Sequence, residues 1–176
     1  MKATFRLVMV LFIVCALAAG SLAFVNAATK ERIASFAREE RLEALRQVFP
    51  EADDFREVVP GREWEALKAG QRIGGVLAAS IQGYSGTILS FVGLDRTNVI
   101  TGVKVLSQSE TPGLGAKIAE ERFLKQFRGL SPAEVALRRD DPAGKIDAVT
   151  AATISSRALT VSLRRSLDAH LKGDRK

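Results

Sequence analysis

Two short stretches of the chain hold residue types that could bind a ligand. The first runs from Asp147 to Thr153, where a predicted strand turns into a predicted helix. Its small residues let the backbone approach a ligand closely, and a helix N-terminus presents unpaired N–H groups that suit a phosphate. Hydroxyl groups gather here, at Thr150, Thr153, Ser155 and Ser156. A hydroxyl in this position either caps the helix or contacts a phosphate, and local physics alone favours the cap.

The second stretch runs from Glu110 to Gly115, after a predicted strand. Pro112 and the two glycines, Gly113 and Gly115, fix a sharp loop in which backbone N–H groups and the Glu110 carboxylate could face a ligand. Considered alone, the stretch fits a plain turn between a strand and a helix.

The other chemistry-bearing residues indicate neither a metal site nor nucleic-acid binding. The only cysteine, Cys15, lies in an apolar run, which leaves no disulfide and no thiolate metal site in the folded domain. The only histidine, His170, lies near the end of the last predicted helix, where it compensates the helix dipole. The net charge of +6 is mild and interspersed. Trp64 and Tyr84 are single aromatics of the kind that usually fill a core, so we assign neither to a ligand.

The N-terminal segment predicts a membrane anchor. No charged residue occurs from Leu7 to Ala28, and about 20 apolar residues span a bilayer as a helix. Lys2 and Arg6 precede the segment, which predicts a cytoplasmic N-terminus and an extracytoplasmic domain. Ala27 could also end a cleavable signal peptide, although the apolar run is longer than a signal core.

The 176 residues, 47% of them hydrophobic, suit one compact domain with an appended segment. We divide the chain into an anchor (1–28), an amphipathic helical stalk (29–60) and a folded domain (61–176). The helix predicted from Thr29 to Val48 is ended by Pro50. Its apolar positions are Ile33, Phe36, Leu42, Leu45 and Val48.

Strand-like runs cover residues 73–81, 87–94 and 99–106, with turn-rich segments between them. In the last run we expect Val99, Thr101, Val103 and Val105 to share one face. Helices are expected over 116–127 and from Ser131, a short strand over 145–149, and a closing helix over 153–171 with leucines at four-residue steps. This order predicts an α+β fold, an antiparallel sheet packed with helices, after one transmembrane helix.

Together the two stretches resemble the FMN-binding domain shared by the G subunit of Rnf-type electron transport complexes and the C subunit of the sodium-translocating NADH:quinone reductase. The resemblance extends from about Gly83 to His170. It rests on the segments 83–86, 92–95, 102–106, 110–118 and 147–153, in this order. In that family the last segment reads Asp, two variable residues, Ser or Thr, Gly, Ala, Thr. Its final threonine carries FMN through a phosphoester bond, which a flavin transferase installs from FAD.

The resemblance implies covalent FMN on Thr153. The other cofactor-binding residues that it implies are Asp147, Thr150, Ala152, Ser155, Glu110, Thr111, Gly113, Leu114 and Gly115. Two positions depart from the family pattern. Ala151 stands where the family usually has glycine, and alanine is costly there if the position needs a positive φ. Gln108 stands where relatives often show histidine.

The resemblance further implies a non-catalytic electron-transfer subunit in a bacterial inner membrane. Its partners would be the other membrane subunits of an Rnf-type complex, which couples ferredoxin and NAD redox chemistry to ion transport, and the flavin transferase that matures it. The chain length favours the Rnf subunit over the sodium-pump subunit. Two alternatives stay open: an anchored protein that holds FMN non-covalently, and an anchored scaffold without flavin.

Overall fold

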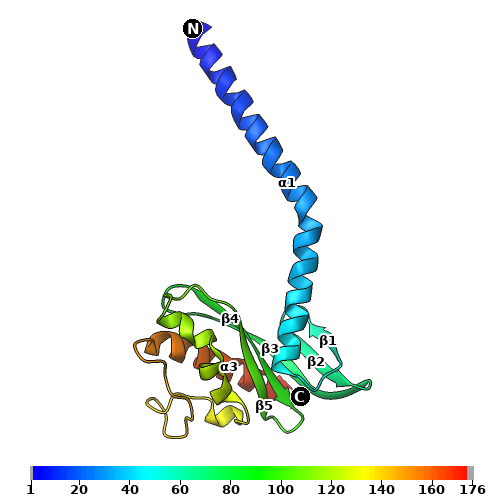
Figure 1. Ribbon diagram of the computed structural model, residues 1–176, viewed down its shortest axis with the longest axis vertical. Helices are drawn as coiled ribbons and strands as arrows, with labels where there is room; N and C mark the ends of the chain where they lie inside the picture. Colours follow the sequence, from blue (N-terminus) through cyan, green and yellow to red (C-terminus); the bar gives the residue numbers. More distant parts are fainter. Residues whose placement is uncertain (1, 174–176) are drawn as a thin grey trace. The chain divides into compact units, whose positions relative to one another are not determined.

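The computed structural model describes the backbone of residues 2–173. It comprises two units, and the boundary between them along the chain falls between Arg41 and Leu42. The first unit is purely helical and belongs to α1 (Lys2–Val48), drawn in blue in Figure 1. By its length and composition α1 can cross a membrane, and the apolar side chains of its N-terminal half are exposed. The predicted N-terminal apolar helix is therefore confirmed.

The last turns of α1 belong to the folded unit. Leu45 and Val48 are buried there with Trp64 and Phe91, whose rings meet edge to face at 4.9 Å. Trp64 is thus a core residue. The helix ends at Val48, two residues before Pro50, as its sequence predicts.

Five strands form one antiparallel sheet in the order β1-β2-β3-β4-β5. They are β1 (Asp54–Val59), β2 (Glu63–Lys68), β3 (Gln71–Gln82), β4 (Thr87–Asp95) and β5 (Ile100–Ser107). The three predicted strands correspond to β3, β4 and β5. Strands β1 and β2 are additional, and β1 occupies residues that the sequence pattern assigned to the helical stalk. Both are rich in charged residues with low strand propensity. Pairing within the sheet, of β2 with β3 and of β1 with β2, therefore determines their conformation and local preference does not.

A bulge in β5 makes the predicted single face of that strand wrong. The pairing with β4 shifts by one residue at Thr101. Ile100 consequently joins Val103 and Val105 in the core under α3, whereas the Thr101 hydroxyl donates to the carbonyl oxygen of Val48 at 2.9 Å on the opposite face. Strict alternation assumes an unbroken strand, and a bulge resets it.

The end of α1 rests directly on the sheet, and this contact requires small residues. A Cβ atom on Gly102 would lie 2.8 Å from the Val48 carbonyl oxygen, and one on Gly93 would lie 2.9 Å from a Val48 methyl group. Both glycines fall in segments that carry the family resemblance. Their role is to let a helix approach the sheet.

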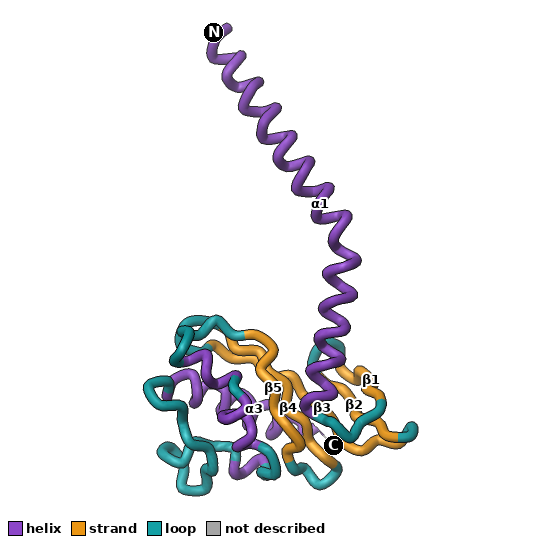
Figure 2. Tube along the Cα trace, in the orientation of Figure 1, coloured by secondary structure: helices purple, strands orange, loops and turns teal. Residues whose placement is uncertain are grey.

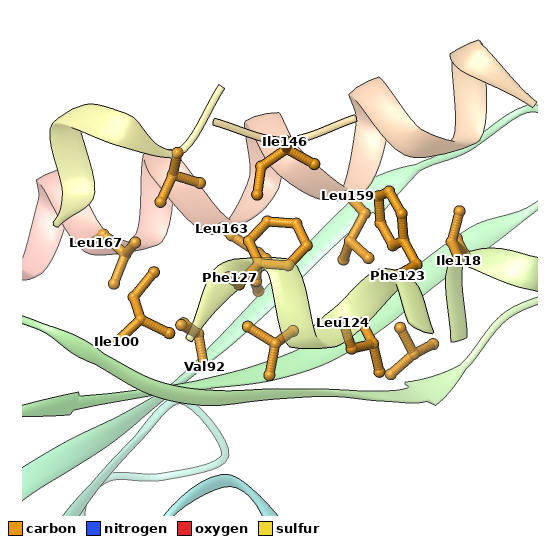
Figure 3. Packing of buried hydrophobic residues seen from close by; sticks show 14 of the residues in the cluster. Val92, Ile100, Ile118, Phe123, Leu124, Phe127, Ile146, Leu159, Leu163 and Leu167 are labelled. Carbon is orange, nitrogen blue, oxygen red and sulfur yellow. The ribbon is translucent and has the colours of Figure 1, made fainter. Parts of the chain in front are cut away.

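The other face of the sheet carries α3 (Thr153–Gly173) and several short helical turns (Figure 2). The turns are η1 (Gly115–Ala119), α2 (Glu121–Leu124), η2 (Lys125–Phe127) and η3 (Pro132–Glu134). Figure 3 shows Leu159 and Leu163 of α3 beside Phe123 and Phe127, and Leu167 beside Ile100. The closing helix and the α+β class are confirmed.

Three predicted elements are shorter than expected. The helix predicted over 116–127 is divided into three turns, because Glu120 adopts an extended conformation between η1 and α2. The strand predicted over 145–149 is reduced to a single bridge between Leu137 and Ile146. The helix predicted from Ser131 is the single turn η3, with a capping box between Ser131 and Glu134.

Candidate functional site

The two stretches singled out in the sequence meet at one cleft of about 460 Å³. Three segments line it: the turn between β3 and β4, the loop after β5, and the N-terminus of α3. The lining residues are Tyr84, Glu110, Thr111, Leu114, Gly115, Ala151, Ala152, Thr153, Ile154 and Ser155. Segments far apart in the chain are thus brought together where a helix begins.

The buried side chain of Glu110 connects these three segments through hydrogen bonds. Its side chain is 4% exposed. One carboxylate oxygen accepts a hydrogen bond of 2.5 Å from the Ser155 hydroxyl, and the other accepts one of 3.1 Å from the Ser85 N–H. Although the residue borders the cleft, its carboxylate is therefore engaged by the protein itself.

The ionised form of Glu110 is favoured in this setting. Burial opposes ionisation, but the hydrogen bonds from the Ser155 hydroxyl and from the N–H groups of Ser85, Gly86 and Tyr84 outweigh it and lower the pKa of the carboxyl below its ordinary value. The Glu110 N–H in turn donates to the Gln108 side chain at 2.6 Å. Gln108 thus orients the loop that carries Glu110.

Two glycines make room for the Glu110 carboxylate. A Cβ atom on Gly83 would lie 2.4 Å from one carboxylate oxygen, and a Cβ atom on Gly115 would lie 2.8 Å from both the other oxygen and the Ser155 hydroxyl. These positions need glycine for close approach. Gly113 differs, since it has a φ of 76° and open space around it.

Thr153 is the first residue of α3 and is partly buried at the cleft. Its hydroxyl oxygen accepts a hydrogen bond of 3.3 Å from the Arg139 guanidinium. Ser155 donates to Glu110 instead of receiving a helix N–H. Among residues 2–173, no N–H of α3 bonds to either hydroxyl, so neither acts as the helix cap that local physics favoured.

The turn before Thr153 has a strained residue at its third position. The Ala152 N–H donates to the Val149 carbonyl at 3.0 Å, and Ala151 has a φ of 62°. This is the type II pattern, which favours glycine at that place. The positive φ that would make alanine costly at position 151 is therefore present. The buried Ser156 hydroxyl holds the turn, because it accepts from the Val149 N–H at 3.0 Å and donates to the Ala152 carbonyl at 2.9 Å.

Asp147 and Thr150 do not line this cleft. Both are exposed and border a neighbouring hollow of about 410 Å³ that also contains Lys117, Arg122 and Lys125. Asp147 lies 3.5 Å from the Arg138 guanidinium, and its backbone N–H donates to the Gln126 side chain at 2.8 Å. These contacts hold the start of the stretch in place.

Three lining or neighbouring residues carried no functional assignment from sequence. Tyr84 and Ile154 lie at the cleft with more than half of their surface exposed, next to the exposed Leu114. Arg139 precedes Thr153 by 14 residues, in a segment after the helix expected from Ser131. No local pattern signals its proximity to Thr153.

Comparisons with known proteins agree with this architecture. Residues 83–168 match the FMN-binding domain, and residues 1–48 match the RnfG N-terminal region. The G subunit of the ion-translocating oxidoreductase complex of Stutzerimonas stutzeri is 37% identical over 180 residues, covering 89% of this chain and 76% of that protein. The G subunit of the Na⁺-translocating ferredoxin:NAD⁺ oxidoreductase complex of Acetobacterium woodii is 30% identical over 193 residues, covering 96% and 92%.

The crystal structure of the C subunit of the Na⁺-translocating NADH-quinone reductase from Parabacteroides distasonis has a similar fold, with a TM-score of 0.54 and 25% identity. The match covers 62% of this chain and 60% of that chain. Since these relatives match over most of their length and both family regions agree, the chain belongs to the family of G subunits of ion-translocating oxidoreductase complexes.

Proposed function

We propose that this chain relays electrons in a membrane-bound, Rnf-type ion-translocating oxidoreductase complex through FMN attached to Thr153 by a phosphoester bond. The observation that carries the proposal is the place of the Thr153 hydroxyl. It lies at the first turn of α3, on the cleft, beside the Arg139 guanidinium. A helix N-terminus and a guanidinium both favour a phosphate group.

The residues of the cleft fit FMN at both of its ends. The exposed side chains of Tyr84, Leu114 and Ile154 offer apolar surface for an isoalloxazine ring, while Thr153 in the cleft and Arg139, which bonds to it, suit the phosphate end. Bound FMN would supply the electron transfer, and the protein would supply position and environment. The buried Glu110 would hold the two loops together while remaining ionised, which leaves the cleft without a free carboxylate for acid–base catalysis.

Attachment would be a group transfer from FAD, catalysed by a flavin transferase. The Thr153 hydroxyl oxygen forms a bond to the flavin-side phosphorus of FAD. The bond between this phosphorus and the oxygen of the adenylate phosphate breaks, AMP leaves, and the threonine proton passes to the transferase. No oxidant or reductant is consumed. The turn at Ala151 must present Thr153 to the transferase during this step.

We further propose a single-pass arrangement, with the N-terminus in the cytoplasm and the folded domain outside it. Lys2 and Arg6 precede the apolar part of α1, which supports this orientation. By extension from the Acetobacterium relative, the electrons would pass between ferredoxin and NAD through partner subunits. A covalent bond keeps the cofactor with the protein in a compartment where free FMN is scarce.

Intact-mass spectrometry tests the attachment. The full chain is produced together with a flavin transferase, alongside Thr153→Ala and Thr29→Ala. We expect the FMN mass increment on the wild type and on Thr29→Ala, whose exposed hydroxyl lies on α1, outside the folded unit. Thr153→Ala should lack the increment, and a full increment on this variant would exclude Thr153.

The positive φ of Ala151 favours one second candidate, a protein that holds FMN non-covalently. Strain at this residue would disfavour the geometry that the transferase needs. In that case the yellow colour would leave the polypeptide on denaturation, whereas a phosphoester adduct would remain.

A further inference from the structure

The arginines around the start of α3 differ in how their charges are compensated. Arg138 lies 3.5 Å from Asp147, Arg157 binds Asp140 through two contacts of 2.6 and 2.7 Å, and Arg164 lies 3.3 Å from Asp141. Arg139 has no carboxylate of the described residues within 4.0 Å, and at longer range its charge adds to the hydrogen bonds and charge of Arg157 in lowering the pKa of the Asp140 carboxyl. Its hydrogen bond goes to the neutral hydroxyl of Thr153.

We infer that Arg139 is a positioning residue for the phosphate group that joins FMN to Thr153. This inference rests on the proposed covalent attachment. A phosphate diester carries one negative charge, and its free oxygens would lie two bonds from the Thr153 hydroxyl oxygen that Arg139 already contacts. A guanidinium presents several N–H donors in one plane and binds phosphate oxygens through more than one of them.

The position of Arg139 relative to α3 is fixed by its neighbours. Asp140 ties the same loop to α3 through its paired contacts with Arg157. The N–H groups of Asp140 and Asp141 both donate to the Leu137 carbonyl, at 2.9 and 3.1 Å. The loop therefore turns tightly at the residue whose guanidinium faces Thr153, so little reordering is needed when the phosphate arrives.

The dipole of α3 acts in the same direction. This helix extends over 21 residues, and its N-terminal end, where Thr153 lies, carries a partial positive charge. Arg139 adds a full positive charge to that partial charge. An arginine that only touches a surface hydroxyl would contribute little, because exposed polar pairs are screened by water. Arg139 therefore either binds the phosphate group or only contacts the Thr153 hydroxyl, and these two roles can be distinguished by experiment.

A comparison of variants in the full-length chain separates them. Arg139→Gln and Arg139→Lys are incubated with transferase and FAD beside the wild type and Arg165→Gln. The last variant makes the same charge change at an exposed position of α3, about 18 Å from Thr153 along the helix. The initial rate of FMN addition is followed by intact mass, and the ³¹P NMR shift of the attached diester is recorded after complete loading.

We expect Arg139→Gln to load about three to ten times more slowly and to shift the ³¹P resonance, with the loss of a charge-assisted hydrogen bond as the cause. Arg139→Lys should load at an intermediate rate, and Arg165→Gln should match the wild type in both measurements. A loaded Arg139→Gln variant with the wild-type ³¹P resonance overturns the inference, whatever its rate. A wild-type chain that never gains FMN on Thr153 overturns the proposed function as well, which distinguishes the two failures.

Discussion

The hydroxyl of Ser155 donates to the carboxylate of Glu110 at 2.5 Å, although 45 residues separate them in the chain. This contact connects the loop after β5 to the first turn of α3. The same carboxylate holds the β3–β4 turn through the Ser85 N–H. The buried Glu110 therefore holds together the segments that line the cleft. Through Ser155 it fixes the start of α3, whose first residue is Thr153.

Replacing Glu110 with glutamine should destabilise the folded unit. One acceptor oxygen would become an NH₂ group facing the Ser155 hydroxyl or the Ser85 N–H, which leaves a buried donor unsatisfied at about 1–3 kcal/mol. Thermal unfolding of the full chain in detergent measures this change as a midpoint lowered by several degrees. The control is Glu121→Gln, an exposed residue paired with Arg128, which should change the midpoint little. Equal midpoints for both variants would contradict the role given to Glu110.

The stability that Glu110 contributes should depend on pH. Its hydrogen bonds lower the pKa of the folded-state carboxyl below the ordinary value of 4.5. The contribution is therefore complete above pH 4.5 and is lost as the pH falls through the lower, folded-state pKa. Midpoints of the wild type and Glu110→Gln should differ most near neutral pH and converge at acidic pH. The other acidic residues are the same in both proteins, so their effects on the midpoint cancel. A difference between the two midpoints that stays constant across the pH range would contradict this account.

Replacing Ala151 with glycine should relieve the backbone strain of its turn. A residue other than glycine with a φ of 62° costs about 1 kcal/mol. The control is Ala69→Gly, because Ala69 has a φ of 50° in the turn between β2 and β3. Both variants should unfold at a higher temperature, but only Ala151→Gly should speed flavin loading. Equal loading rates for the two would show that the strain at Ala151 does not limit attachment.

Replacing Gly115 with alanine should disturb the cleft from within. The added Cβ atom would lie 2.8 Å from both the Glu110 carboxylate and the Ser155 hydroxyl, a distance that forces one of them to move. Overpacking of this kind costs about 1–3 kcal/mol. Gly20→Ala serves as the control, since its Cβ atom would meet nothing within 4 Å. An unchanged unfolding midpoint for Gly115→Ala would indicate that the packing of Gly115 against the Glu110 carboxylate and the Ser155 hydroxyl is looser than described.

Regular periodicity made part of this fold predictable. The alternation along β3 to β5 and the leucines of α3 identified the elements around the main core. The charged strands β1 and β2 gave no such signal, because pairing stabilises them: β2 pairs with β3, and β1 pairs with β2. The sequence pattern did not predict the bulge at Thr101 either, because one extra residue shifts the alternation of side chains without changing the composition of the strand.

The parts of the site that lie in sequence motifs were predictable, and the parts that depend on long-range contacts were not. The stretches around Glu110 and Thr153 were identified as ligand-binding candidates, and they do meet at one cleft. The inward direction of the Glu110 carboxylate depends on Gly83 and Gly115, which no local pattern reveals. Arg139 reaches Thr153 through an irregular loop fixed by Asp140 and Arg157, and such long-range contacts follow from tertiary packing alone.

Localisation of FMN by tandem mass spectrometry tests the central claim most directly. The full chain is loaded by the transferase, digested, and the peptide that spans residues 147–157 is fragmented. We predict that the FMN increment resides on Thr153, with Thr150, Ser155 and Ser156 unmodified. An increment on any of these other hydroxyls, or a loaded chain that releases all its flavin on denaturation, would contradict the account.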